Sequence, residues 1–125
     1  ACPMWVPIVE NHEADSPGAD YFVRKYVDSL FARRSDIDTV LLACTHFPIL
    51  YDKIRAAVPP QARVVCQGEI VAESLADYLR RHPEMESRCS RGAACTYLTT
   101  ENPDSFSSLA AIFLDEPVDV THVDL

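Results

Sequence analysis

Four stretches of the chain carry apolar residues at the spacing of an amphipathic helix. In residues 19–34 the apolar side chains recur three and four positions apart, at Phe22, Val23, Tyr26, Val27, Leu30 and Phe31. That period places them on one face of a helix. Residues 48–58, 69–81 and 103–114 follow the same period. Pro48 suits the first position of its helix, and Asn102 is a suitable N-cap for the last one.

Short apolar runs lie between these predicted helices. Residues 37–43 are almost continuously apolar and partly β-branched, which is typical of a buried central strand in a parallel sheet. Residues 63–66, 94–99 and 118–123 are three further strand candidates. Because strands and helices alternate from residue 37 onward, the pattern predicts an α/β protein with a mainly parallel sheet and flanking helices.

The opening run Met4–Val9 is apolar but contains Pro7. Proline cannot donate a hydrogen bond to a strand ladder, so we expect a buried loop or a short edge strand here. The run ends at an acidic residue, Glu10. Residues 11–18 and 82–92 are polar and contain proline and glycine, so we expect both to be loops.

Composition narrows the function classes. The 125 residues correspond to one compact domain or to pieces of a larger protein, and the chain does not begin with methionine. Its net charge of -8 weighs against nucleic acid or an anionic membrane as the main partner. No apolar run approaches the roughly 20 residues that span a bilayer, and we see no signal-peptide pattern.

The cysteines point to an intracellular protein with reduced thiols. There are five of them, an odd number, at Cys2, Cys44, Cys66, Cys89 and Cys95. None forms a CxxC pair, so neither a disulfide framework nor a structural zinc site is expected, and no metal is predicted. Proteins with reduced, unpaired cysteines are typical of the cytoplasm, so we expect this protein to be cytoplasmic.

The candidate catalytic and binding residues Cys44, Thr45 and His46 directly follow the most apolar predicted strand. In open α/β sheets, ligands bind beyond the carboxyl ends of the strands. A following helix N-terminus would favour a thiolate there, and His46 could exchange a proton with it. From position alone, a reactive Cys44 and a merely packed Cys44 fit the pattern equally well. Glu10 is either an acid that reaches into this site or a solvated loop carboxylate.

Two segments carry a resemblance to a known family. Residues 39–50, Thr-Val-Leu-Leu-Ala-Cys-Thr-His-Phe-Pro-Ile-Leu, resemble the C-terminal active-site motif of the glutamate racemases. Residues 1–10, Ala-Cys-Pro-Met-Trp-Val-Pro-Ile-Val-Glu, resemble a segment upstream of that motif, and the chain's last 29 residues are similar to the family's C-terminus. Ala43 and Phe47 stand where the family usually has glycine and tyrosine.

The resemblance implies an activity and a set of roles. The family interconverts L- and D-glutamate without a cofactor, for bacterial peptidoglycan, using two cysteines on opposite faces of the substrate. By motif, Cys44 is one of these cysteines and His46 is its proton partner. Thr45 and His46 would bind the substrate, and Glu10 would be the acid that supports the site.

The resemblance covers only the C-terminal half of the family's usual length. The Asp-Ser pair and the Cys-Asn-Thr motif, which carries the other catalytic cysteine, are missing. We therefore expect a fold that is incomplete relative to the two-domain racemase. Residues 1–67 would be the C-terminal part of the second domain, and residues 68–125 a return segment that completes the first. The partners implied are glutamate, the missing N-terminal half and, to cover exposed faces, a second copy in a homodimer; alone, the chain should be inactive.

Three other interpretations remain open at this stage. A related aspartate-type racemase is disfavoured by His46, because that group commonly has an acid after Cys-Thr. The missing first half also allows a non-catalytic domain or partner-binding module that kept the fold. A thiol hydrolase would also use cysteine and histidine, but no third group or oxyanion site is evident in the sequence.

Overall fold

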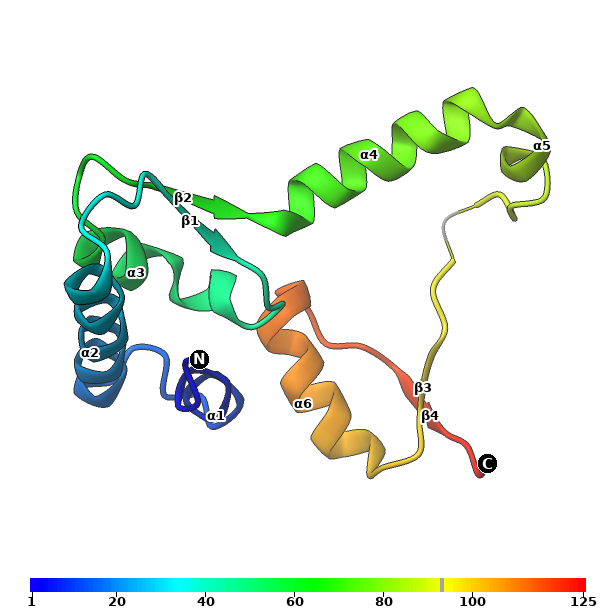
Figure 1. The fold of residues 1–125 in the computed structure, drawn as a ribbon. Coiled ribbons are helices and arrows are strands. Elements are labelled where there is room, and N and C mark those ends of the chain that lie inside the picture. Colours follow the sequence, from blue (N-terminus) through cyan, green and yellow to red (C-terminus); the bar gives the residue numbers. More distant parts are fainter. Residues whose placement is uncertain (93) are drawn as a thin grey trace. The chain divides into compact units, whose positions relative to one another are not determined.

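The computed structural model describes residues 1–92 and 94–125. These form two compact units, Ala1–Arg81 and His82–Leu125, which are considered separately below. Both contain parallel strands and helices, so the predicted α/β class is confirmed (Figure 1).

The first unit is built on two parallel strands. Strand β1 (Thr39–Leu42) pairs with β2 (Arg63–Cys66), with Thr39 opposite Arg63 and Leu42 opposite Cys66. Its helices are α1 (Trp5–Glu10), α2 (Pro17–Arg33), α3 (Tyr51–Ala57) and α4 (Gln67–Arg81), and a 3-10 turn, η1 (Phe47–Leu50), precedes α3. The predicted helices near residues 19–34 and 69–81 and the strands near 37–43 and 63–66 are confirmed.

The core of this unit lies where α1, α2 and α3 meet the strands. Its largest fully buried side chains are Leu42, Leu50, Ile54, Val9 and Val23. Helix α2 starts where the sequence offers a cap, because the Ser16 hydroxyl accepts a hydrogen bond from the Ala19 N–H at 3.2 Å and Pro17 follows. Residues three and four apart then bring Ala19, Val23 and Val27 onto the buried face.

The expectation for the opening run was wrong, because it forms helix α1. Pro7 is the third residue of this helix, and a first-turn N–H has no partner within the helix, so proline costs little there. Trp5, Ile8 and Val9 are buried. Burial of one helical face therefore outweighs the strand-like run of apolar residues.

Helix α1 ends in a Schellman motif. The His12 N–H donates to the Val9 carbonyl at 3.0 Å, and the Glu13 N–H donates to the Ile8 carbonyl at 2.9 Å. His12 has a left-handed backbone, with φ of 58°. A side chain with a Cβ is strained in that conformation, and glycine usually occupies this position.

Replacing His12 with glycine should therefore stabilise the chain by about 0.5–1 kcal/mol, the relief of strain being partly offset by a more flexible unfolded state. The measurement is urea unfolding followed by circular dichroism, with an unchanged slope and a higher midpoint. Glu13→Gly is the matched control and should be destabilising, because Glu13 has no positive φ. A lower midpoint for H12G would contradict the strain argument.

The second unit contains another parallel pair. Strand β3 (Tyr97–Thr99) pairs with β4 (Val120–His122), and α6 (Pro103–Leu114) lies between them in sequence. The predicted cap of α6 is confirmed, since the Asn102 side chain accepts hydrogen bonds from the N–H groups of Asp104 and Ser105. The loop predicted at 82–92 is wrong in part, because Pro83 opens a short helix, α5 (Pro83–Glu86).

Several apolar faces in the chain lack cover. No residue of α4 is buried, and Ile70, Val71 and Leu75 on this helix are each more than half exposed. Helix α6 also buries no residue.

The domain division between residues 67 and 68, which was inferred from the resemblance, concerns the complete two-domain fold and stays a prediction. Among the described residues, no helix is long and apolar enough to cross a membrane.

Candidate functional site

The site predicted from the sequence assembles at the carboxyl end of β1. The strand ends at Leu42, so Cys44, Thr45 and His46 follow it directly. Glu10 is the last residue of α1 and is 36 positions away from His46 in sequence. The fold nevertheless brings all four residues together within the first unit, where ligands of α/β proteins bind.

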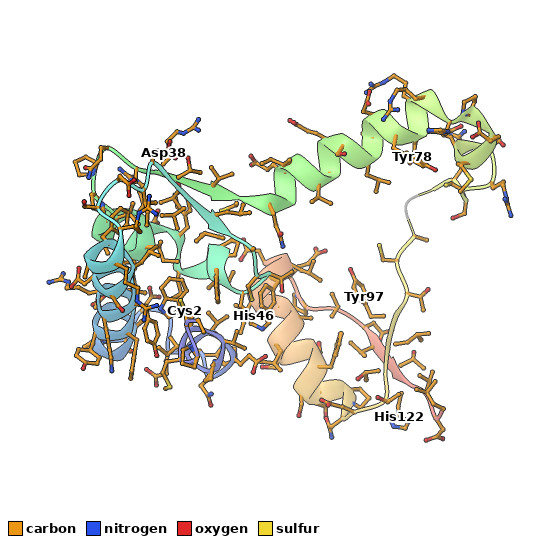
Figure 2. The ribbon with its side chains drawn as sticks, in the orientation of Figure 1. Cys2, Asp38, His46, Tyr78, Tyr97 and His122 are labelled. Carbon is orange, nitrogen blue, oxygen red and sulfur yellow. The ribbon has the colours of Figure 1, made fainter. Side chains whose placement is uncertain are left out.

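His46, labelled in Figure 2, contacts each of the other three residues of the cluster. Its Nε2 lies 3.1 Å from Glu10 Oε1. On the other side of the ring, Nδ1 lies 3.9 Å from Cys44 Sγ and 3.4 Å from the Thr45 hydroxyl oxygen. The imidazole therefore stands between a carboxylate and two groups that can donate a proton.

This arrangement selects a tautomer. An ionised carboxylate only accepts hydrogen bonds, so Glu10 is satisfied when the proton of a neutral His46 is on Nε2. Nδ1 then presents a lone pair toward the thiol of Cys44 and the hydroxyl of Thr45. A histidine held this way can take the thiol proton, and the resulting imidazolium is stabilised by Glu10. The 3.9 Å separation suits a contact that shortens when a substrate is bound.

Backbone and aromatic contacts hold these side chains in position. The Phe47 N–H donates to the Cys44 carbonyl and the Ile49 N–H to the His46 carbonyl, each at 3.2 Å. The rings of Trp5 and Phe47 meet edge to face, with centroids 4.8 Å apart. Since Trp5 begins α1 and Glu10 ends it, this contact links the carboxylate to the turn that carries His46.

The helix expected directly after the motif differs in detail. The α-helix begins at Tyr51 rather than Pro48, and the intervening η1 is a 3-10 turn. Cys44 is thus separated from the α-helix by this turn. Support for a thiolate comes from His46 rather than from a helix that starts at the motif.

The cluster is half open to solvent. Cys44 is half-buried, and the side chains of His46 and Glu10 are 22% and 44% exposed. An ion pair that is this accessible contributes little to stability. Proton transfer at a carbon atom would need a further surface to exclude water from the site.

Three other cysteine and histidine side chains have local surroundings of their own. Burial raises the pKa of the Cys2 thiol, which lowers its thiolate fraction at neutral pH. His82 contacts Glu84 and His122 contacts Asp124, each its own neighbour in sequence. Within residues 1–92 and 94–125, no group of three or more His, Cys, Asp or Glu side chains is arranged so that it could hold a metal ion.

Sequence reasoning missed the positioning role of Trp5. It is 4% exposed and contacts both Phe47 and Tyr26. A signal was present, because Trp5, Ile8 and Val9 follow a helical spacing. Pro7 obscured it.

Comparison with known proteins gives a consistent result. No family model matches the chain. The glutamate racemase of Ruegeria pomeroyi is 40% identical over 114 residues, which are 91% of this chain and 40% of that protein. The glutamate racemase of Streptococcus equi subsp. equi is 33% identical over 125 residues, 100% of this chain and 46% of that protein.

Solved structures agree with these relatives. A glutamate racemase isoform from Bacillus anthracis superposes with a TM-score of 0.82 at 27% identity. The Thermus thermophilus glutamate racemase in complex with β-chloro-D-alanine gives 0.79 at 33% identity. Each match covers 100% of this chain and 46% of the other. The chain therefore spans less than half the length of the glutamate racemases it matches, and its fold is partial relative to theirs.

Proposed function

We propose that this chain, which matches glutamate racemases along nearly all of its length, forms one side of a glutamate racemase active site. The observation that carries the proposal is the row Cys44–His46–Glu10 at the carboxyl end of β1. The reaction is the interconversion of L- and D-glutamate without a cofactor. Its product in the bacterial cytoplasm would be D-glutamate for peptidoglycan synthesis.

Racemisation needs a base on one face of the α-carbon and an acid on the other. The Cys44 thiolate removes the α-proton and becomes a thiol, and the electron pair stays on the substrate as a carbanion. A second cysteine, outside this chain, donates its proton to the opposite face and becomes a thiolate. In the reverse direction the two cysteines exchange roles, so no net proton is gained or lost.

The other three residues prepare Cys44 and hold the substrate. His46 accepts the thiol proton at Nδ1, and Glu10 orients the ring through Nε2. Thr45 is exposed beside the cluster and offers its hydroxyl to a substrate carboxylate. The carboxylate of Glu10 also stabilises the imidazolium while the thiolate is present.

Cys44 is the cysteine that contacts His46, and a chain that supplies one acid–base group should not racemise glutamate alone. The test measures exchange of the glutamate α-proton for deuterium in heavy water by NMR. The chain is assayed alone and then after co-expression with the part of the Ruegeria pomeroyi enzyme that it does not match. We expect exchange and racemisation only in the complex. A verified complex without exchange would contradict the proposal.

A non-catalytic module is the second candidate, because the chain spans under half of its relatives and its site is half open. This candidate predicts a complex that forms but does not exchange the α-proton of glutamate.

If the chain belonged to an aspartate-type racemase, the α-proton of aspartate should exchange faster than that of glutamate. Both amino acids are therefore assayed in parallel.

A further inference from the structure

A second thiol lies at the edge of the sheet that carries the candidate site. Cys66 is the last residue of β2, and the parallel register places it opposite Leu42, the last residue of β1. Cys44 follows Leu42 by two positions. Because the carboxyl ends of parallel strands meet at one edge of a sheet, Cys44 and Cys66 belong to the same edge. The proposed racemisation uses Cys44 and gives Cys66 no task.

The register also sets the separation of the two cysteines. Neighbouring strands are about 4.8 Å apart and each residue adds about 3.3 Å, so one strand across and two residues along separate two Cα atoms by about 8 Å. Disulfides form at Cα separations of about 4.4–6.8 Å, so a shift of about 1–2 Å in Cys44 brings the pair within range. Cys44 lies beyond the last register pair, Leu42 and Cys66. The shift therefore falls on the loop after β1 and leaves the ladder intact.

Both thiols are accessible, and one of them has a base beside it. Cys44 and Cys66 are each half-buried. The Nδ1 of His46 lies 3.9 Å from Cys44 Sγ and can take its proton, and Glu10 stabilises the imidazolium through Nε2. Thiolate character and exposure are what make a cysteine susceptible to peroxide, and redox-sensing cysteines are often placed next to a second, resolving cysteine. Disulfides of cytoplasmic proteins are usually of this transient kind.

We propose that Cys44 is a site of reversible oxidation by hydrogen peroxide and that Cys66 is its resolving thiol. The Cys44 thiolate attacks one peroxide oxygen, the O–O bond breaks, and the sulfur becomes a sulfenic acid while the departing hydroxide takes the proton held by His46. The Cys66 thiol then attacks the Cys44 sulfur, the S–O bond breaks, and the oxygen leaves as water with the Cys66 proton. Two thiols are thereby oxidised to one disulfide, and one hydrogen peroxide is reduced to two waters.

The disulfide would switch off the acid–base group of the site. Cys44 can neither accept nor donate a proton while its sulfur is bonded to Cys66. Two equivalents of a small thiol restore both cysteines by thiol–disulfide exchange. The inference rests on the proposed function only for this loss of activity, because the bond itself forms without glutamate or a partner.

Peptide mapping after mild oxidation tests the link. Trypsin leaves the three cysteines of the first unit in separate peptides, residues 1–24, 35–53 and 64–80. The chain is treated with a small excess of hydrogen peroxide, the remaining thiols are alkylated, and the digest is analysed by mass spectrometry without reduction. We expect residues 35–53 and 64–80 as a disulfide-linked pair. No linked pair, or a link from Cys44 to Cys2, would overturn the inference.

Substitution of the resolving thiol separates its role from that of Cys44. In Cys66→Ser the sulfenic acid has no partner and proceeds to the sulfinic acid, which small thiols do not reduce. Cys2→Ser is the matched control, because Cys2 is also a half-buried cysteine of the first unit, and the link should form in C2S as in the wild type. If C66S does not fold, Cys66→Ala gives the same readout. A link that disappears in C2S would overturn the inference.

Activity of the complex is an independent measurement. The chain co-expressed with the remaining part of the Ruegeria pomeroyi enzyme is oxidised, and α-proton exchange at glutamate is measured before and after dithiothreitol. We expect exchange to fall at least about tenfold, because the general acid–base group is lost, and to recover in the wild type but not in C66S. Before oxidation, C66S and C2S should exchange at the wild-type rate. A disulfide from Cys44 to a cysteine of the remaining part would overturn the inference.

The two proposals fail in different ways. A link between Cys44 and Cys66 in a chain whose complex does not exchange the glutamate α-proton would support the oxidation site and reject the racemase activity. Exchange by a complex that recovers equally well in C66S and the wild type would do the reverse.

Discussion

Replacing Cys44 with serine should reduce α-proton exchange at glutamate by about 10³-fold in the complete enzyme, the usual contribution of a positioned general acid–base group. Serine preserves the shape of the side chain, so the fold and the binding of glutamate should remain. Its hydroxyl is a far weaker acid than a thiol and does not supply the base that the reaction needs. NMR measures the exchange, and the fall is expected in kcat with little change in KM.

Cys89→Ser is the matched control for this substitution. Cys89 belongs to the second unit, His82–Leu125. It is exposed, and its Sγ lies 3.6 Å from the carbonyl oxygen of Met85 in the same unit. We expect exchange at the wild-type rate in C89S. If C44S exchanged the α-proton at the wild-type rate, Cys44 would take no part in the reaction. The half-buried Cys44 of the wild type would then be a packing residue.

Replacing Trp5 with alanine should destabilise the first unit by about 3–5 kcal/mol, as is usual for a buried tryptophan. Trp5 is 4% exposed, and its ring packs against Phe47 and Tyr26. Its loss would also free α1 from η1 and loosen the contact of Glu10 with His46. Circular dichroism in urea measures the stability, and α-proton exchange in the complex reports the second effect.

Trp5→Phe separates packing from hydrogen bonding. The indole Nε1 is buried and has no hydrogen-bond partner within the described part of the chain. Phenylalanine therefore loses contact area but no hydrogen bond, and W5F should cost much less than W5A. Equal losses for the two variants would show that the indole N–H makes a stabilising contact.

Much of the local structure was predictable because it is encoded by neighbours in sequence. The period of apolar residues defines the helix near 19–34, and Asn102 marks the start of α6 through a bond to residues two and three positions ahead. The 3-10 turn and α5 were not foreseen, since a few residues carry too little periodic signal to separate a turn from a loop. The motif at Cys44–His46 was also predictable, because the motif and the apolar strand before it lie in one short segment of the sequence.

The opening run shows where local reasoning failed. Its apolar residues and Pro7 fitted an edge strand, but Trp5, Ile8 and Val9 gain more from burial together on one face of a helix. That gain depends on α2 and η1, which are supplied by other parts of the chain. A pattern records that residues are apolar, whereas the surface that covers them decides which conformation buries them best.

By itself, the sequence determined the α/β class, the position of most helices and strands, and the identity of the candidate acid–base residues. Only the tertiary structure decided that Glu10 contacts His46 across 36 positions and that Trp5, through Phe47, links the helix of Glu10 to the turn after His46. The physical reason is the range of the forces involved. Helix periodicity and capping act between residues a few positions apart, while burial and strand pairing depend on segments that only folding brings together.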